Sequence, residues 1–209
     1  SRLLQAIVDT DQNPKFIHFS SAAVYGNPKS LPIKEDFKTE PISPYGFHKL
    51  QAETLLKEYH DLYNLQTVNL RVFSAYGPGL KKQLLWDVFQ KINKAGGGPI
   101  TLYGTGNESR DFIYIEDILQ AIDLILEKAP FQGEVFNIAN EKEIRISEVV
   151  SQFLDALNLN NQIVFGGEEK KGDPINWKAD ISKLKDLGYQ QKFELKEGLI
   201  KYSKWIENE

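Results

Sequence analysis

Short apolar stretches alternate with longer stretches of mixed apolar and polar residues along this chain, a pattern that predicts strands alternating with helices. The predicted strands cover residues 15–20, 67–73, 100–103, 134–138 and 162–165. The predicted helices cover residues 44–63, 82–94, 116–128, 147–157 and 195–206. Regular alternation of this kind indicates an α/β fold in which helices cover a parallel sheet.

Several predicted helix ends carry recognisable signals. Ser43 before Pro44 is typical of an N-cap followed by a first-turn proline, and Ser147 before Glu148 predicts a second N-cap. The run Gly-Gly-Gly-Pro at 96–99 predicts a helix stop and a turn.

The composition is ordinary for a globular protein and excludes several classes of function. The 209 residues are 41% hydrophobic and 26% charged, enough for one substantial domain or two small ones. No apolar run approaches the roughly 18 residues of a membrane span, and the first residues lack the layout of a signal peptide, so we expect a cytoplasmic protein without a membrane partner. The net charge of −4 argues against nucleic acid as a partner.

Cysteine and histidine exclude two further kinds of chemistry. The chain has no cysteine, which excludes disulfides and thiol catalysis. Its three histidines, His18, His48 and His60, are scattered and form no metal-ligand pattern. We therefore expect no metal site.

The best candidate for chemistry is a tyrosine and a lysine near the start of the first long predicted helix. Tyr45 and Lys49 are four residues apart, so they project from one face of a helix. A neighbouring ammonium favours the phenolate and lowers a tyrosine pKa from about 10 towards the working range of a base. Ser21, at the end of a predicted strand, can hydrogen-bond the reacting oxygen. Together the three residues predict redox chemistry on a hydroxyl group.

The spacing of Tyr45 and Lys49 alone is a weak signal, because any amphipathic helix can carry it. The neighbouring motifs strengthen it. They are Ser-Ser-x-x-Val-Tyr-Gly at 20–26, Leu-Arg-Val-Phe-Ser-Ala-Tyr-Gly-Pro at 70–78 and Ser-Arg-Asp-Phe at 109–112, with further motifs at 103–106, 135–138, 171–174, 179–183 and 197–199. With these motifs, in this order over nearly the whole chain, the sequence resembles the extended short-chain dehydrogenase/reductase family, specifically its NAD-dependent nucleotide-sugar epimerases and dehydratases of the UDP-glucose 4-epimerase type.

The resemblance implies a Rossmann-like parallel sheet with a smaller α/β substrate-binding region. Residues 1–75 would form the C-terminal half of the NAD-binding Rossmann domain. Residues 76–209 would mainly bind the nucleotide sugar, with about 111–140 returning to the Rossmann sheet. The glycine-rich turn that holds the NAD pyrophosphate does not occur in the chain, since Gly104-x-Gly106 lacks the third glycine and a following long helix. We therefore expect that the N-terminal Rossmann half is missing from these residues, and that the complete protein is a homodimer.

The resemblance also assigns roles around the cofactor. Tyr45 would be the general base that removes the proton of a sugar hydroxyl while the hydride of that carbon passes to NAD. Lys49 would lower the pKa of the tyrosine and bond the nicotinamide ribose, and Ser21 would share the substrate hydroxyl. Ser20 would neighbour the nicotinamide, and Phe73 would flank it.

For the substrate, the resemblance places Arg110 at the diphosphate, where a planar guanidinium suits bidentate phosphate contact. Lys170 stands where many relatives carry a second phosphate arginine, and Ser74 where most carry an asparagine. The remaining substrate-binding candidates are Ser21, Gln83, Leu84, Asp173 and Trp177, the last at a gate position beside the sugar pocket. Arg71, at the end of a buried strand, is instead expected to be a structural ion-pair partner.

Two alanines divide the family's reactions. Dehydratases place an Asp and a Glu directly after the catalytic serine, where this chain has Ala22 and Ala23. Neither alanine can move a proton, so the chain favours epimerisation over elimination. We predict an NAD-dependent nucleotide-sugar epimerase, most closely a UDP-hexose 4-epimerase. An NADPH-linked reductase of a nucleotide keto-sugar and a catalytically silent nucleotide-binding module stay open, as do the sugar, its nucleotide and the carbon.

Overall fold

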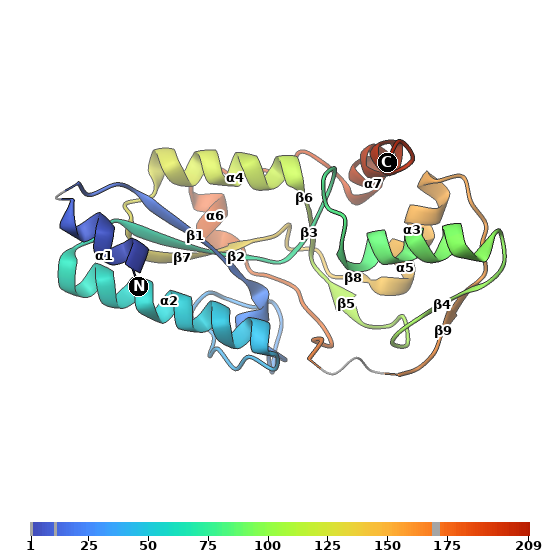
Figure 1. Cartoon of the computed structure of the whole chain (residues 1–209), viewed down its shortest axis with the longest axis horizontal. Coiled ribbons are helices and arrows are strands. Elements are labelled where there is room, and N and C mark those ends of the chain that lie inside the picture. The colour runs from blue at the N-terminus through green and yellow to red at the C-terminus, as the bar shows by residue number, and fades with distance from the viewer. Residues whose placement is uncertain (1, 11, 169–171) are drawn as a thin grey trace.

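The computed structural model describes residues 2–10, 12–168 and 172–209 (Figure 1). At its centre lies a sheet of three parallel strands. In spatial order they are β1 (Phe16–Ser21), β2 (Thr67–Val72) and β7 (Gln132–Ile138). The register pairs Ser21 with Val72 and Val72 with Ile138, so the carboxyl ends of the three strands finish together. The predicted α/β fold with a parallel sheet is confirmed.

Helices cover both faces of this sheet, as Figure 1 shows. On one face lies α2 (Pro44–Tyr63) with α1 (Arg2–Asp9) packed against it, and on the other lie α4 (Ile115–Lys128) and α6 (Ser182–Asp186). The middle strand β2 is buried along almost its whole length, and its apolar residues Val68, Leu70 and Val72 alternate with polar ones, Thr67, Asn69 and Arg71. The core on the α4 side contains Leu70, Ile125 and Ile138, all fully buried.

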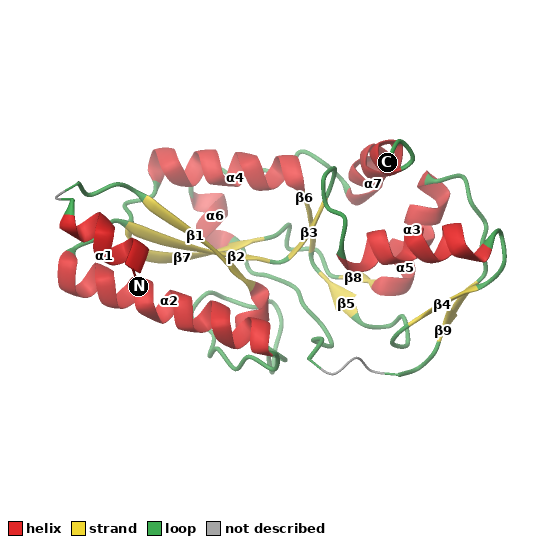
Figure 2. Ribbon diagram, viewed as in Figure 1, coloured by secondary structure: helices red, strands yellow, loops and turns green. Residues whose placement is uncertain are grey.

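Beside the sheet lies a second group of helices with short paired strands (Figure 2). Its helices are α3 (Gln83–Ala95), α5 (Ile146–Ala156) and α7 (Leu195–Ile206). Its strand pairs are β3 (Ser74–Tyr76) with β6 (Phe112–Tyr114), β4 (Ile100–Leu102) with β9 (Ile163–Phe165), and β5 (Ser109–Arg110) with β8 (Ile144–Arg145). Val88, Phe153 and Leu199, one from each helix, belong to its buried core.

All ten predicted elements are present, with ends that differ by at most two residues. The N-cap at Ser43 is confirmed, since its Oγ accepts the Gly46 N–H at 3.2 Å. The stop after α3 is confirmed as well, with Gly96 in the left-handed region at φ 55°.

The predicted N-cap at Ser147 is wrong. Helix α5 begins one residue earlier, at Ile146, and its N-cap residue is Arg145. The N–H groups of Ile146 and Ser147 donate to the carbonyls of Glu108 and Gly106, at 2.8 and 3.0 Å. A turn about 40 residues away therefore satisfies the first donors of this helix in place of a side-chain cap.

The alternation of apolar and polar residues did not predict several of the short elements, although it predicted the three-residue strands β4 and β9. Those it did not predict include β3, β5, β6, β8, α6 and the 3-10 helix η1 (Ala22–Val24). The strands among them have two or three residues, too few for a period to show. Within the described ranges, no helix has both the length and the apolar character needed to cross a bilayer.

Candidate active site

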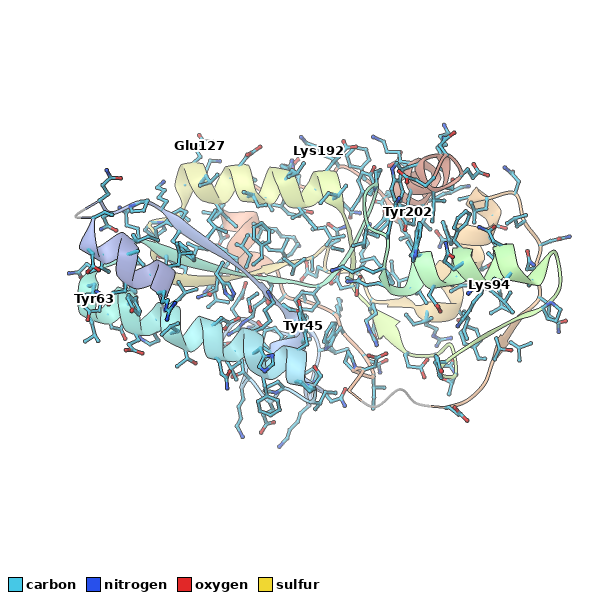
Figure 3. All side chains as sticks on the ribbon, viewed as in Figure 1. Tyr45, Tyr63, Lys94, Glu127, Lys192 and Tyr202 are labelled. Atoms are coloured by element: carbon cyan, nitrogen blue, oxygen red, sulfur yellow. The ribbon has the colours of Figure 1, made fainter. Side chains whose placement is uncertain are left out.

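The carboxyl end of β1 and the start of α2 meet at one place in the fold. Ser21 ends β1 and caps η1, where its Oγ accepts the Ala23 N–H at 3.2 Å. Helix α2 begins at Pro44, and Figure 3 labels Tyr45 at that end of the helix, near the end of β1. The Tyr45 side chain is 56% exposed, so it is accessible to a substrate.

Gly46 makes this close approach possible. A Cβ at Gly46 would lie 2.5 Å from the Ala23 carbonyl oxygen and 2.9 Å from the Cβ of Pro41. The first turn of α2 therefore rests directly on η1, which brings Tyr45 next to the segment that starts at Ser21. Sequence reasoning missed Gly46, although a glycine inside a predicted helix is a signal of close packing.

Lys49 joins the same group. Its Nζ donates to the carbonyl oxygen of Phe19 at 2.6 Å and lies 5.6 Å from the centroid of the Tyr45 ring. The structure thus gathers Ser21, Tyr45 and Lys49 around the end of β1. This arrangement suits proton transfer at a hydroxyl group. The Tyr45 hydroxyl could accept and return the proton, with the ammonium of Lys49 as its cationic neighbour.

Behind these residues lies a buried ionic network. The Ser20 Oγ donates to the Glu53 carboxylate, and Arg71 binds both carboxylate oxygens, with Nη2 at 2.7 Å from Oε2. Burial lowers the pKa of Arg71, but its interactions with the Glu53 carboxylate and the Tyr25 hydroxyl outweigh burial and raise the pKa above its ordinary value. The predicted structural ion-pair role of Arg71 is confirmed. Sequence reasoning did not identify its partner Glu53.

Phe73 and Trp177 are buried, in contrast to the exposed Tyr45. The Phe73 ring packs between the rings of Tyr25 and Trp177, with centroids 6.3 and 5.8 Å away. The Trp177 Nε1 donates to the Gly26 carbonyl oxygen at 3.0 Å, and its side chain is buried. Their roles beside nicotinamide and sugar stay predictions. These contacts show that the chain around Trp177 packs against Tyr25 and Gly26, directly after η1.

Arg110, in β5, is held by carbonyl groups. Its Nη1 donates to the carbonyls of Ser109 and Ile175 at 2.8 and 3.1 Å, and its guanidinium lies 5.4 Å from the Trp177 ring centroid. Burial lowers the pKa of Arg110, while the charge of Asp173 acts in the opposite direction. Among the described residues, Nε and Nη2 have no hydrogen-bond partner, so two guanidinium nitrogens remain for an anion.

Asp111 follows Arg110 in the Ser-Arg-Asp-Phe motif, and the sequence alone predicts no role for it. Its buried carboxylate accepts the N–H groups of Asn140 and Ala179 at 2.9 and 3.0 Å. Burial raises the pKa of Asp111 to about 7, although these backbone hydrogen bonds act in the opposite direction. The carboxylate joins three segments of the chain behind Arg110.

The remaining candidates are spread over the second group of elements. The N–H of Ser74 donates to the Asp111 carbonyl oxygen at 3.0 Å. Gln83 is exposed at the start of α3 with φ 67°, and Leu84 packs against the core there. Asp173 is exposed. Lys170 lies outside the described residues. The substrate contacts of all five stay predictions. In the part of the chain that the structure describes, no cluster of His, Asp or Glu could hold a metal ion.

Known proteins resemble this chain in sequence and in fold. Residues 1–139 match the NAD dependent epimerase/dehydratase family. The uncharacterized UDP-glucose epimerase YtcB of Bacillus subtilis is 34% identical over 187 residues, which cover 88% of this chain and 58% of that protein. The chain spans 58% to 63% of the length of four such relatives.

Solved structures agree. The UDP-glucuronic acid 4-epimerase of Bacillus cereus, in complex with UDP-glucuronic acid and NAD, has a TM-score of 0.90 and 31% identity, and the match covers 99% of this chain and 65% of that one. The UDP-N-acetylglucosamine 4-epimerase of Methanobrevibacter ruminantium M1 has a TM-score of 0.88 and 30% identity, with 99% and 67% covered. The family match spans more than half of the chain and the fold agrees with it throughout, so this chain belongs to the NAD dependent epimerase/dehydratase family.

Proposed function

We propose that the full-length protein epimerises a nucleotide-diphosphate sugar with NAD, most closely as a UDP-hexose 4-epimerase. The observation that carries the proposal is the gathering of Ser21, Tyr45 and Lys49 at the end of β1, directly beside Ala22 and Ala23. Similar proteins whose names state an activity support it, since several are 4-epimerases of UDP-sugars.

Each of the three side chains has a distinct task in this proposal. The Tyr45 Oη takes the proton of the sugar hydroxyl and later returns it, and the Ser21 Oγ holds that hydroxyl in place. The ammonium of Lys49 has three N–H donors, of which one is used on Phe19, so others remain for ribose hydroxyls and for support of the Tyr45 phenolate. NAD, when bound, supplies the acceptor and donor of the hydride exchanged with the sugar carbon.

The chemistry of this donor set fits the nicotinamide end of NAD. Lys49 and the Ser20 region lie at the carboxyl ends of parallel strands, where ligands of such sheets bind. The sequence contains no Gly-x-Gly-x-x-Gly motif for the pyrophosphate, so the fit concerns the nicotinamide end alone.

Ala22 and Ala23 separate epimerisation from elimination. Ala22 is fully buried and Ala23 is half-buried against α2. Neither side chain can donate or accept a proton, so water loss across the sugar ring would lack an acid and a base at these positions.

On the substrate side, we propose that Arg110 binds the diphosphate through Nε and Nη2. Supporting contacts would come from Ser74, Gln83, Leu84, Lys170, Asp173 and Trp177. In this proposal, residues 1–75 with about 111–140 form the cofactor half and the rest mainly binds the nucleotide sugar. A cytoplasmic homodimer is the expected state of the full-length protein.

Purified full-length protein tests the proposal when it is incubated with UDP-hexoses without added cofactor. We expect a mixture of C4 epimers. Denaturing the protein should release NAD, which mass spectrometry identifies. Consumption of added NADPH with formation of a reduced sugar would instead identify a reductase. Tight UDP binding without any turnover would identify a silent binding module. A 4-keto-6-deoxy product would show that elimination proceeds despite Ala22 and Ala23.

A further inference from the structure

Glu53 is the third residue of a line along α2. Tyr45, Lys49 and Glu53 follow one another at intervals of four residues, so all three lie on the same face of the helix. Lys49 donates to the carbonyl of Phe19, and Glu53 accepts the hydroxyl of Ser20. Consecutive turns of the helix therefore hold consecutive residues of β1, directly before Ser21.

The contact made by Glu53 is buried and charged. Glu53 is 6% exposed, Ser20 is 4% exposed and Arg71 is 6% exposed. A buried carboxylate needs a counter-charge and good hydrogen-bond geometry, and Arg71 supplies both through its bidentate contact. Apolar side chains of similar volume often stabilise a fold as well as such a pair does. Unlike an apolar contact, the Glu53–Arg71 pair fixes the direction of its hydrogen bonds, and with it the position of the Ser20 hydroxyl.

Arg71 extends the network to the other side of η1. Its Nη1 donates to the Tyr25 Oη and to the Glu35 carbonyl oxygen, both at 2.9 Å. The Tyr25 hydroxyl in turn donates to the Asn137 Oδ1 at 2.7 Å, on strand β7. One carboxylate thus fixes both ends of the segment 20–25, directly at Ser20 and through Arg71 at Tyr25.

We propose that Glu53 is a positioning residue, which sets Ser21 against Tyr45 and Lys49 through Ser20 and Arg71. The proposal rests on the epimerase function proposed above and deepens it. In this proposal the Ser20 hydroxyl is bound by a carboxylate, while the hydroxyl of its neighbour Ser21 accepts an N–H of η1.

The test is a double-mutant cycle in the full-length protein between Glu53→Gln and Ser21→Ala. We expect Glu53→Gln to lower kcat about tenfold to a hundredfold, the cost of misplacing a reacting group by about an ångström, with KM for the UDP-sugar unchanged. If Glu53 acts through Ser21, the double variant should be no slower than Ser21→Ala alone. Glu58→Gln, an exposed position on the same helix, is the matched control and should leave kcat unchanged.

Removing one charge of a buried pair can unfold a protein, so the cycle is repeated with Glu53→Met/Arg71→Met, which leaves no buried charge. Hydrogen–deuterium exchange gives a readout that does not depend on turnover. We expect faster exchange over residues 20–25 in this variant and unchanged exchange in α5.

Effects of Glu53 and Ser21 that multiply independently, or unchanged exchange over residues 20–25, would overturn the positioning role while leaving the epimerase function intact. A wild-type protein that converts no UDP-hexose would overturn both.

Discussion

The two ends of the candidate site are held by different means. Around Tyr45, side chains hold the structure: Lys49 reaches β1, and Glu53 joins Ser20 to Arg71. Around Arg110, the main chain does so: the guanidinium donates to two carbonyls, and the Asp111 carboxylate accepts backbone N–H groups.

The difference fits the two tasks proposed for these ends, proton exchange at Tyr45 and diphosphate binding at Arg110. Groups that exchange a proton must be placed to within a fraction of an ångström, which locked side chains achieve. A diphosphate needs a cation with unused donors, and a frame of carbonyls leaves those donors open. We therefore expect substitutions near Tyr45 to change the rate, and substitutions near Arg110 to change the affinity.

Tyr45→Phe should have the largest effect. It removes the proton acceptor and little else, so kcat should fall by about 10²–10⁴-fold, the usual contribution of a general acid and base. Calorimetry should find an unchanged affinity for UDP. Substantial remaining turnover would show that Tyr45 is not the base. The region around Tyr45 would then not be the one that controls the rate.

Arg110→Ala should weaken binding of UDP and of the UDP-sugar by about 1.5–3 kcal/mol, the scale of hydrogen bonds to a charged group. The fold should persist, because the carbonyls around Arg110 belong to other paired segments. Arg145→Ala, on the neighbouring strand β8, is the control and should bind UDP as the wild type does. Equal UDP affinity in both variants would make Arg110 a structural residue.

Gly46→Ala sharpens the comparison at the Tyr45 end. Helix propensity alone predicts that alanine stabilises a helix by up to about 1 kcal/mol relative to glycine. The Ala23 carbonyl and Pro41 leave no room for a methyl group, so we expect a loss of about 1–3 kcal/mol in the free energy of unfolding, together with a lower kcat. Denaturant titration shows whether the free energy of unfolding falls or rises. Gln51→Ala, at an exposed position of the same helix, is the control. A stabilised, fully active variant would mean that α2 does not rest on η1.

Lys142→Ala should have the smallest effect. Its ion pair with Glu194 has an N–O distance of 2.6 Å but lies at the surface, so the free energy of unfolding should change by less than about 1 kcal/mol. High salt should reduce even that difference. Lys142 lies two residues after Asn140, whose N–H binds the Asp111 carboxylate behind Arg110. A larger loss would therefore show that side-chain charges, and not only main-chain hydrogen bonds, stabilise the region around Arg110.

The sequence alone predicts the order of elements, which the structure confirms, and it proposes the residues that would bear the chemistry. Ser43, Pro44 and the three glycines at 96–98 are local signals, and each places a helix end correctly because the hydrogen bonds concerned lie within a few residues. The spacing of Tyr45 and Lys49 is local in the same sense.

Only the tertiary structure decides how distant segments share hydrogen bonds. Ser147 looks like an N-cap, yet carbonyls from the 106–108 turn take over that task. Arg71 could have paired with many acidic residues, and packing of α2 on the sheet selects Glu53 and with it Ser20. Gly46 and Ala23 are 23 positions apart in sequence and in contact in the fold. Burial makes the pairing of Arg71 with Glu53 and Ser20 costly to break, because a polar group removed from water needs a partner. In all three cases the partner is set by the packing of whole elements rather than by neighbouring residues.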